Sequence, residues 1–255
     1  MRSWALVTGA TSGIGESFTR LLASNNYNLI LVARDLDRLN ERAGALQEKF
    51  GVETVVLKAD LSTDAGCSLI ESYIAKHEID VLVNNAGFGI NKAFTVSDVQ
   101  AEEDLLAVLV RTPMRLMHVA LPGMKARDKG VVINVSSVAG FIAGGTYSAS
   151  KSYLTVLSES LNTELRGSNV KVSALCPGFT RTEFHQRGRM SMKGLPAFMW
   201  LNADKLVAKA WSDGLKGKAV SVPGWQYQLL TFVIHLAPRH MVRRFGMKVR
   251  VKQRR

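Results

Sequence analysis

Residues 131–151 read VVINVSSVAGFIAGGTYSASK, a stretch that leads from a strand through a loop into a helix. The run VVINV is apolar and β-branched, which favours a buried strand, and the serines and glycines after it favour a loop. Tyr147 and Lys151 are four positions apart on the expected helix, so they lie on one face about one turn apart. A neighbouring ammonium favours the phenolate and moves the pKa of a tyrosine toward neutral pH, where a phenol can exchange protons. A bare Tyr-x-x-x-Lys is more often an ordinary solvated pair, so the rest of the sequence has to show whether this pair is catalytic.

Short apolar runs alternate with helix-length segments along the chain, which is typical of a parallel sheet covered by helices. The expected strands are residues 4–7, 29–33, 54–59, 81–84, 131–135, 170–175 and 219–222. Residues 36–50 and 101–127 have apolar positions three and four apart, as in helices, and Pro113 predicts a kink or a late start in the second. No linker divides residues 1–213. We therefore expect one α/β domain at residues 1–222 with about seven strands, and an extension at residues 223–255.

The composition is that of a folded soluble protein, with 47% hydrophobic and 21% charged residues in a chain of 255. The net charge of +12 is concentrated in residues 214–255, which contain ten Lys or Arg and no Asp or Glu. Cys67 and Cys176 are the only cysteines, and they have neither the spacing of metal ligands nor that of a disulfide framework. A reducing compartment, and so a cytoplasmic location, is the simpler expectation. The short apolar run at the N-terminus leads into a glycine motif and is not expected to be a secretory signal.

A glycine-rich turn follows the first expected strand. Residues 8–15 read TGATSGIG, with Gly9, Gly13 and Gly15 placed before a helical pattern. Glycines permit a tight turn and a close backbone approach, and the free amides of a helix start favour a pyrophosphate. The turn alone has a purely structural explanation, but between a first strand and a first helix it favours dinucleotide binding.

The ends of the next strands bear on the kind of dinucleotide. The second strand ends in Ala33, Arg34 and Asp35. Alanine at the place of a ribose-binding acid, followed by a guanidinium, favours NADP(H) over NAD(H), although Asp35 can instead bind the ribose or neutralise Arg34. Asp60 ends the third strand and residues 84–87, NNAG, end the fourth, where such sheets bind ligands; each can also be a loop cap.

These motifs, together with TYSASK and residues 177–182, PGFTRT, occur in the order and approximate spacing of the short-chain dehydrogenase/reductase family. The resemblance covers residues 3–215. It implies a Rossmann-type doubly wound sheet, and hydride transfer between a nicotinamide and a carbonyl or alcohol carbon. It also implies that Tyr147 is the acid and base, that Lys151 lowers the pKa of Tyr147 and binds the nicotinamide ribose, and that Ser137 orients the substrate oxygen.

The resemblance further implies a cofactor-binding set without a metal, and a homo-oligomer as the default assembly. This set comprises Gly9, Ser12, Gly13, Ile14, Gly15 and Arg34 at the phosphates and ribose, Asp60 and Leu61 at the adenine, Asn85, Ala86 and Gly87 at the adenosine ribose, and Tyr147, Lys151, Pro177, Gly178 and Thr182 at the nicotinamide.

Two departures from the family pattern stand out. Ser137 is ten positions before Tyr147 and Ser136 eleven, closer than in most members, so the loop between should be tighter and should open or reshape one wall of the substrate site. We prefer Ser137 because the family's catalytic serine is usually the second of such a pair.

Leu109 stands where many members have an asparagine that steadies a helix irregularity and a relay water, and leucine cannot make those hydrogen bonds. We expect a working enzyme; the alternative is a dinucleotide-binding regulatory or scaffold protein.

The segment 184–211 is the expected substrate loop. It includes His185 as a possible substrate contact and several apolar side chains that suit a lipid-like ketone, steroid or acyl chain, or that simply pack in the domain or a dimer. These are Met190, Met192, Leu195, Phe198, Met199, Trp200 and Leu201.

The C-terminal tail combines apolar and basic residues. Its apolar part, residues 229–237, is far below the ~20 residues that span a bilayer. Trp225, Tyr227 and Phe232, followed by eight Lys or Arg after Pro238, fit adsorption to an anionic membrane at the inner face. The alternative is a solvated basic tail whose apolar stretch packs on the domain; binding of nucleic acid is not expected, since no reading module accompanies the charge.

Overall fold

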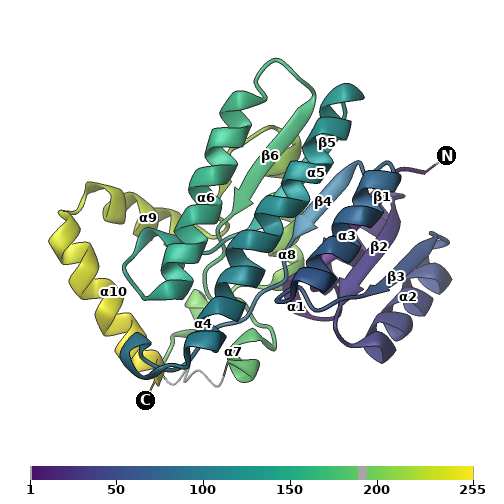
Figure 1. The fold of residues 1–255 in the computed structure, drawn as a ribbon. Helices are drawn as coiled ribbons and strands as arrows, with labels where there is room; N and C mark the ends of the chain where they lie inside the picture. Colours follow the sequence, from purple (N-terminus) through teal and green to yellow (C-terminus); the bar gives the residue numbers. More distant parts are fainter. Residues whose placement is uncertain (1, 189–193, 255) are drawn as a thin grey trace.

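The computed structural model describes residues 2–188 and 194–254, without the side chains of residues 185, 245 and 248–254 (Figure 1). Seven parallel strands form one sheet in the order β3-β2-β1-β4-β5-β6-β7. The strands are β1 Trp4–Thr8, β2 Asn28–Ala33, β3 Thr54–Lys58, β4 Val81–Asn84, β5 Gly130–Val135, β6 Val170–Leu175 and β7 Val220–Ser221. The strand order reverses between β1 and β4, as in a Rossmann-type doubly wound sheet, and the fold predicted from the sequence is confirmed.

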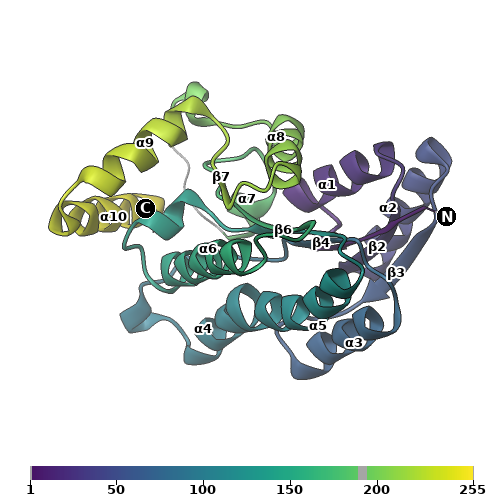
Figure 2. The same cartoon turned by 90° about the horizontal axis from the view of Figure 1, so that it is seen from above.

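Helices cover both faces of this sheet (Figure 2). On one face lie α1 Gly13–Ser24, α2 Leu36–Phe50 and α8 Ala203–Leu215, and on the other lie α3 Asp64–Lys76, α4 Val99–Leu106, α5 Thr112–Ala126 and α6 Thr146–Glu164. The short helix α7 Phe184–Arg187 and the 3-10 turns η1 Phe94–Val96, η3 Val138–Phe141 and η4 Ala197–Met199 belong to connecting segments. After β7 the chain continues into α9 Trp225–Leu236 and α10 Arg239–Arg254, at the edge of the molecule opposite to β3 and α2.

Each face of the sheet has its own hydrophobic core, because successive side chains of a strand point to opposite faces. Ala5 and Val7 of β1 pack with Phe18 and Leu22 of α1, while Leu6 between them packs in the other core. The central strands are buried on both faces, which explains why they are nearly continuous apolar runs rather than alternating ones.

The segment 99–126 is one continuous helix rather than two. A π-helical turn, η2 Ala107–Arg111, joins α4 to α5, and Pro113 lies in the first turn of α5 without breaking it. Proline has no N–H, so the Leu109 carbonyl four residues earlier loses its α-helical donor, and the wider π turn accommodates that loss. Among the described helices this is the one long and apolar enough to cross a membrane; half of its most apolar part is buried, as in a core helix.

The remaining differences from the expected elements are small. β7 has only two residues, since only Val222 separates it from Pro223 and Gly224, and α9 begins at Trp225. β3 ends at Lys58 rather than at residue 59, while β1, β2 and β5 are one residue longer than expected. Boundaries of this kind depend on pairing with neighbouring strands and not on the apolar pattern alone.

Candidate functional site

One cavity of about 1210 Å³ lies at the carboxyl ends of the strands, over the point where their order reverses. It is lined by every predicted site residue except Gly15. These are Gly9, Ser12, Gly13, Ile14, Arg34, Asp60, Leu61, Asn85, Ala86, Gly87, Ser137, Tyr147, Lys151, Pro177, Gly178 and Thr182. Gly15 is buried beneath the turn, where a β-carbon would lie 2.2 Å from the Gly9 carbonyl oxygen, so its place is structural.

Thr8 joins the glycine turn to the loop after β4. Its buried hydroxyl accepts hydrogen bonds from the backbone amides of Asn85 at 2.9 Å and Ala86 at 3.0 Å. The Asn85 side chain donates back to the carbonyls of Thr8 at 2.9 Å and Gly9 at 3.2 Å. Gly9 has a φ of 67°, a left-handed conformation that favours glycine. The Asn85 amide therefore holds two loops together and leaves the backbone of residues 85–87 to line the cavity.

Charged side chains surround the end of the cavity near β2 and β3. Arg34 and Asp60 both line it, and Asp35 caps α2 by accepting a 3.1 Å bond from the Arg38 amide. Burial acts to raise the pKa of Asp60, but two hydrogen bonds from Ser62 and the charge of Arg34 outweigh it and lower that pKa. Asp60 is thus held as a carboxylate, and cation and anion lie together at this end.

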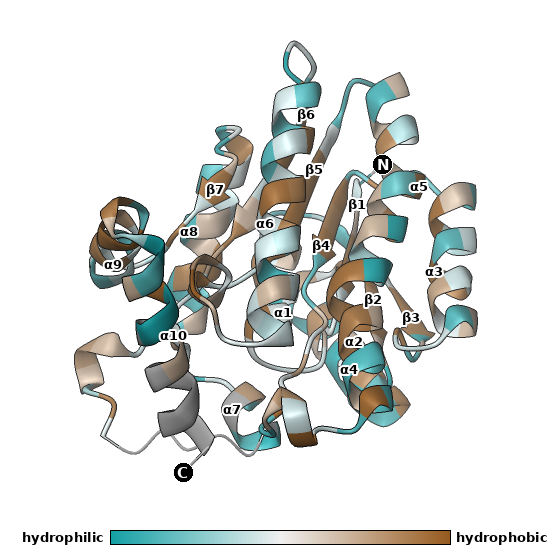
Figure 3. Ribbon diagram, turned by 60° about the vertical axis from the view of Figure 1, so that its left-hand side comes forward, coloured by the Kyte–Doolittle hydropathy of each residue, from teal (hydrophilic) through white to brown (hydrophobic). Residues whose placement is uncertain are grey.

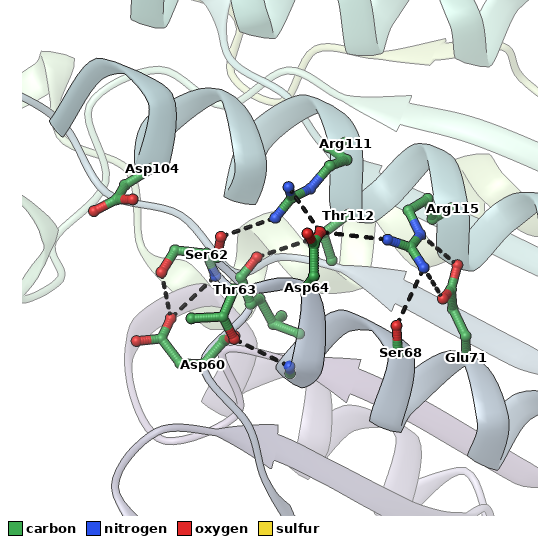
Figure 4. A network of polar contacts seen from close by, with 12 residues as sticks. Asp60, Ser62, Thr63, Asp64, Ser68, Glu71, Asp104, Arg111, Thr112 and Arg115 are labelled. Atoms are coloured by element: carbon green, nitrogen blue, oxygen red, sulfur yellow. Dashed lines mark hydrogen bonds and ion pairs between the residues drawn. The ribbon is translucent and has the colours of Figure 1, made fainter. Parts of the chain in front are cut away.

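The end of η2 and the start of α5 hold the loop that carries Asp60 (Figure 4). Arg111 donates to the Ser62 carbonyl at 2.8 Å and pairs with Asp64 at 2.9 Å, and Thr112 donates to the Leu61 carbonyl at 2.9 Å. Arg111 and Thr112 therefore hold the loop from residue 60 to residue 64 in place.

The two serines after β5 have different surroundings. Ser136 is 2% exposed, and its hydroxyl contacts the Lys151 carbonyl and the Thr155 hydroxyl, both at 2.7 Å. Ser137 lies at the cavity, where its hydroxyl accepts a 3.1 Å bond from the Ala139 amide at the start of η3. The hydroxyl of Ser136 is engaged inside the protein, and that of Ser137 remains beside the cavity.

Tyr147 and Lys151 lie one turn apart on α6, as their spacing predicts. The Lys151 ammonium is 5.6 Å from the centre of the Tyr147 ring and donates to the Val135 carbonyl at 2.6 Å. Burial lowers the pKa of Lys151 to about 8, because the charged form loses its hydration. A buried cation therefore lies beside a phenol at the centre of the cavity.

Leu109 is buried in the π-helical turn next to this pair. It lines a second cavity of about 10 Å³ together with Lys151 and Asn84, a volume close to that of one water molecule. Asn84 donates to Asn134 across β4 and β5 at 2.8 Å, and among the described residues its buried side-chain oxygen has no hydrogen-bond partner. The helix irregularity is thus present although leucine replaces the family's asparagine.

The C-terminal helices form part of the cavity wall, which the sequence did not predict. Tyr227 lines the cavity; its hydroxyl donates to the Met199 carbonyl at 2.6 Å and accepts from the Phe179 amide at 2.9 Å. Leu230 and Ile234 of α9 line the cavity as well. The only hint in the sequence is that residues 227, 230 and 234 are three and four apart, the spacing of one helix face.

The short loop between Ser137 and Tyr147 meets these helices. Phe141 of η3 packs against His235 of α9, with ring centres 5.3 Å apart. Gly246 of α10 lies so close that a β-carbon there would be 2.5 Å from the Ala143 carbonyl oxygen. The tight loop therefore does not leave this wall open, because α9 and α10 pack beside it.

The predicted substrate loop divides between the cavity and other positions. Leu195 and Met199 line the cavity, whereas Phe198 is 60% exposed. Trp200 packs near Phe179 at 6.2 Å between ring centres, and Leu201 pairs with Thr180 in a short bridge. Met190, Met192 and the His185 side chain lie outside the described residues.

Within residues 2–188 and 194–254, no three His, Cys, Asp or Glu side chains gather as metal ligands do. Cys67 and Cys176 are both buried thiols. Burial raises the pKa of Cys176 to about 11, so this thiol stays neutral at neutral pH. The polar chemistry of the cavity thus rests on hydroxyl, ammonium, guanidinium and carboxylate groups.

Comparison with known sequences agrees with this geometry. The sequence model of the family described as short chain dehydrogenase matches residues 3–192. A very-long-chain 3-oxoacyl-CoA reductase of Rattus norvegicus is 32% identical over 187 residues, covering 71% of this chain and 60% of the rat protein. The chain therefore spans less than two thirds of that relative's length.

Solved structures show the same similarity. A short-chain dehydrogenase from Sphingobium yanoikuyae in complex with NADPH has a TM-score of 0.84 at 30% identity, covering 91% of this chain and 93% of that one. The bulky-bulky ketone specific alcohol dehydrogenase from Comamonas testosteroni has a TM-score of 0.79 at 29% identity, covering 91% and 92%.

Proposed function

Because this chain belongs to the short-chain dehydrogenase/reductase family, we propose that it is an NADP(H)-dependent oxidoreductase acting on an apolar carbonyl or secondary alcohol. The predicted family is confirmed, and its members are typically oxidoreductases that act on C=O and CH–OH groups with a nicotinamide dinucleotide, which supports the proposed enzyme class. The observation that carries the proposal is the meeting of Ser137, Tyr147 and Lys151 in one cavity with the glycine turn.

A dinucleotide fits the residues around the cavity. The turn from Gly9 to Gly13 precedes the start of α1, where backbone amides favour a pyrophosphate, and Arg34 adds a cation at the adenosine end. When bound, the nicotinamide supplies the hydride in reduction and accepts it in oxidation. Gly9, Ser12, Gly13, Ile14, Arg34, Asp60, Leu61, Asn85, Ala86, Gly87, Pro177, Gly178 and Thr182 would hold it, with Gly15 supporting the turn from below.

Tyr147 is proposed as the acid in reduction and the base in oxidation. The Lys151 ammonium favours the phenolate electrostatically, and its bond to the Val135 carbonyl fixes its position. Ser137 is proposed to orient the substrate oxygen, because the Ser136 hydroxyl is engaged with Lys151 and Thr155. In reduction the phenol proton passes to the substrate oxygen as negative charge develops there, and the Ser137 hydroxyl stabilises that charge.

The preference for NADP(H) rests on guanidinium groups at the adenosine end. Arg34 lines the cavity beyond Ala33, and Arg38 reaches it one helical turn later, where it binds both oxygens of the Glu183 carboxylate at 2.9 and 3.2 Å. Arginine recognises phosphate through paired hydrogen bonds, so this end favours a 2′-phosphate. Asp35 remains the residue that can oppose it, although its carboxylate caps α2.

An apolar substrate fits the opposite end of the cavity. The side chains there are mostly aliphatic, and the rat relative and the Comamonas structure are named for acyl and bulky ketone substrates. These side chains are Val108, Ile142, Phe184, Leu195, Met199, Leu230 and Ile234. A cytoplasmic location and a homo-oligomeric assembly complete the proposal, from the cysteine usage and the family respectively.

The experiment that tests the proposal titrates NADPH and NADH separately and then screens ketones, aldehydes and alcohols for turnover. We expect tighter binding of NADPH, and turnover with apolar carbonyls that Tyr147→Phe abolishes. Tyr153→Phe, a change of an exposed tyrosine on the same helix, is the matched control and should keep full activity.

A second candidate is a regulatory or scaffold protein that binds the dinucleotide without efficient catalysis. The buried Leu109 favours it, since leucine supplies no hydrogen bond to a relay water. This candidate predicts cofactor binding with no turnover in the same screen. Turnover that Tyr147→Phe removes would end it.

A further inference from the structure

Helix α9 is apolar on two opposite sides. Each residue turns an α-helix by about 100°, so residues 227, 230, 231 and 234 share one side, and residues 225, 229, 232, 233 and 236 share the other. The first side faces the domain: Tyr227 and Thr231 are buried, and Leu230 and Ile234 line the cavity. The second side is exposed.

The exposed side of α9 carries large apolar side chains over its whole length. Their exposed fractions are 69% for Trp225, 56% for Leu229, 61% for Phe232, 52% for Val233 and 72% for Leu236. A soluble helix normally has charged or polar residues on the side opposite to the domain. A contiguous exposed apolar stripe instead marks an interaction surface.

The charge beside this stripe is uniformly positive. α10 follows α9 after two residues, and its Arg239, Arg243 and Arg244 are exposed. Residues 214–255 contain ten Lys or Arg and no Asp or Glu. In Figure 3, the hydrophobic segments of α9 lie beside the hydrophilic ones of α10 at one edge of the molecule.

We propose that the outer side of α9, together with the basic helix α10, docks on an anionic lipid bilayer. A bilayer offers both an apolar phase for the stripe and negative head groups for the arginines, and stable adsorption needs two such signals. A second copy of the chain would bring the same positive charge against this surface, and a nucleic acid offers no apolar phase for five large side chains. The 12 residues of α9 and 16 of α10 are too few to span a bilayer, so both helices lie along its surface.

Docking in this orientation puts the cavity next to the lipid. The inner side of α9 lines the cavity and the outer side meets the bilayer, so the two are separated by about one helix diameter, ~10 Å. An apolar substrate concentrated in the bilayer then has a short path to the site. The docking itself requires no reaction, so it stands or falls independently of the proposed activity.

The test is co-sedimentation of the full chain with bound NADPH, using vesicles of phosphatidylcholine alone and vesicles that also contain phosphatidylglycerol. We expect the protein to sediment with the mixed vesicles, to bind phosphatidylcholine only weakly, and to be released at high salt, which screens the charges. The emission of Trp225, taken as the difference from Trp225→Phe, should shift to the blue on binding.

Variants separate the apolar and the basic contributions. Leu229→Gln should lower the vesicle partition coefficient several-fold, and Leu229→Gln with Phe232→Gln by about tenfold or more, because each removes apolar area from the contact. Leu69→Gln changes a leucine of similar exposure on α3, at 47%, and should leave binding unchanged. Arg243→Gln with Arg244→Gln should reduce binding only to the anionic vesicles. Circular dichroism and NADPH affinity check that each variant is folded.

Three results would overturn the proposal. The first is a wild-type protein that stays in the supernatant with both vesicle types, and the second is a double variant of α9 that sediments as well as wild type. The third is a double variant whose vesicle binding is unchanged but whose other interactions are lost. If it turned a dimer into a monomer, the surface would bind a second copy of the chain, and if it lost retention on DNA, the surface would bind nucleic acid.

Discussion

Replacing Tyr227 with phenylalanine removes one oxygen atom that ties the beginning of the substrate segment to its end. The hydroxyl donates to the Met199 carbonyl at 2.6 Å and accepts from the Phe179 amide at 2.9 Å, in a side chain that is 1% exposed. Phenylalanine keeps the ring in contact with Gly178 but leaves both backbone groups without this partner.

The size of the effect follows from those two groups. A buried group that loses its hydrogen bond costs about 1–3 kcal/mol, so we expect the free energy of unfolding to fall by about 2–4 kcal/mol. For a chain of this length the melting temperature should fall by about 4–16 °C. Because burial raises the pKa of Tyr227 to about 12, the phenol is neutral, and the loss should not vary with pH across the neutral range.

The assay is thermal and urea unfolding of Tyr227→Phe beside Tyr153→Phe. Tyr153 is exposed on α6, so its variant should stay within about 0.5 kcal/mol of wild type. The substrate KM of Tyr227→Phe should rise more than its Kd for NADPH, since Tyr227 lines the substrate end. A Tyr227→Phe protein as stable as the control would refute the idea that this hydroxyl holds residues 178–201 in place.

Three further changes test other parts of the site. Burial lowers the pKa of Lys151 in the folded protein to about 8, below its ordinary 10.5, so as pH rises the folded cofactor-free protein loses this proton before the unfolded chain does. The free energy of unfolding of the wild type, relative to that of Lys151→Met, should therefore increase by about 3 kcal/mol between pH 8 and 10.5. If urea unfolding shows the same difference between the two proteins at every pH, the assignment is wrong. Arg111→Met removes the bond to the Ser62 carbonyl in the loop of Asp60, and we expect a Kd for NADPH about 3–10-fold higher by calorimetry. Arg115→Met removes the bonds from α5 to Glu71 and Ser68 of α3 and only a 3.7 Å contact with Asp64, so it should bind nearly as wild type. Leu109→Asn places an amide in the small cavity beside Lys151, and it should raise kcat about 2–10-fold while lowering the free energy of unfolding. An unchanged kcat would show that no proton relay passes through residue 109.

Local pattern predicted the strands, and together with the family resemblance it predicted the cavity-lining residues between Gly9 and Thr182. The β-branched runs could only be buried strands, and the carboxyl ends of parallel strands meet at one edge of the sheet, which brings the turn at Gly9, Asp60, residues 85–87 and Tyr147 together. Gly15 was the exception, because a motif does not show which glycine touches a ligand and which packs beneath it. Likewise, Pro113 indicated an irregular helix but not a π-helical turn, because which residues form the wider turn depends on how the helix packs against the sheet.

The contribution of α9 could not be predicted, for a physical reason. A helix that is apolar on two sides has no sequence signal that tells the side facing the domain from the side facing outward. Tyr227 was expected on a membrane-binding surface, yet it is buried against Gly178, while Trp225, two residues earlier, is exposed. The two sides are distinguished by tertiary packing, in which the Tyr227 hydroxyl bonds to Phe179 and Met199 and its ring contacts Gly178.

The wall formed by α9 and α10 also makes the site modular. The residues proposed to hold the cofactor lie between residues 9 and 182, whereas Tyr227, Leu230, Ile234 and Gly246 come from a segment that adds no strand to the sheet. Substitutions in that segment can resize the substrate end while the nucleotide end keeps its geometry. Under the proposed function, libraries of variants in residues 223–255 would alter the apolar end of the cavity, and the affinity for the dinucleotide would report whether the rest of the fold is intact.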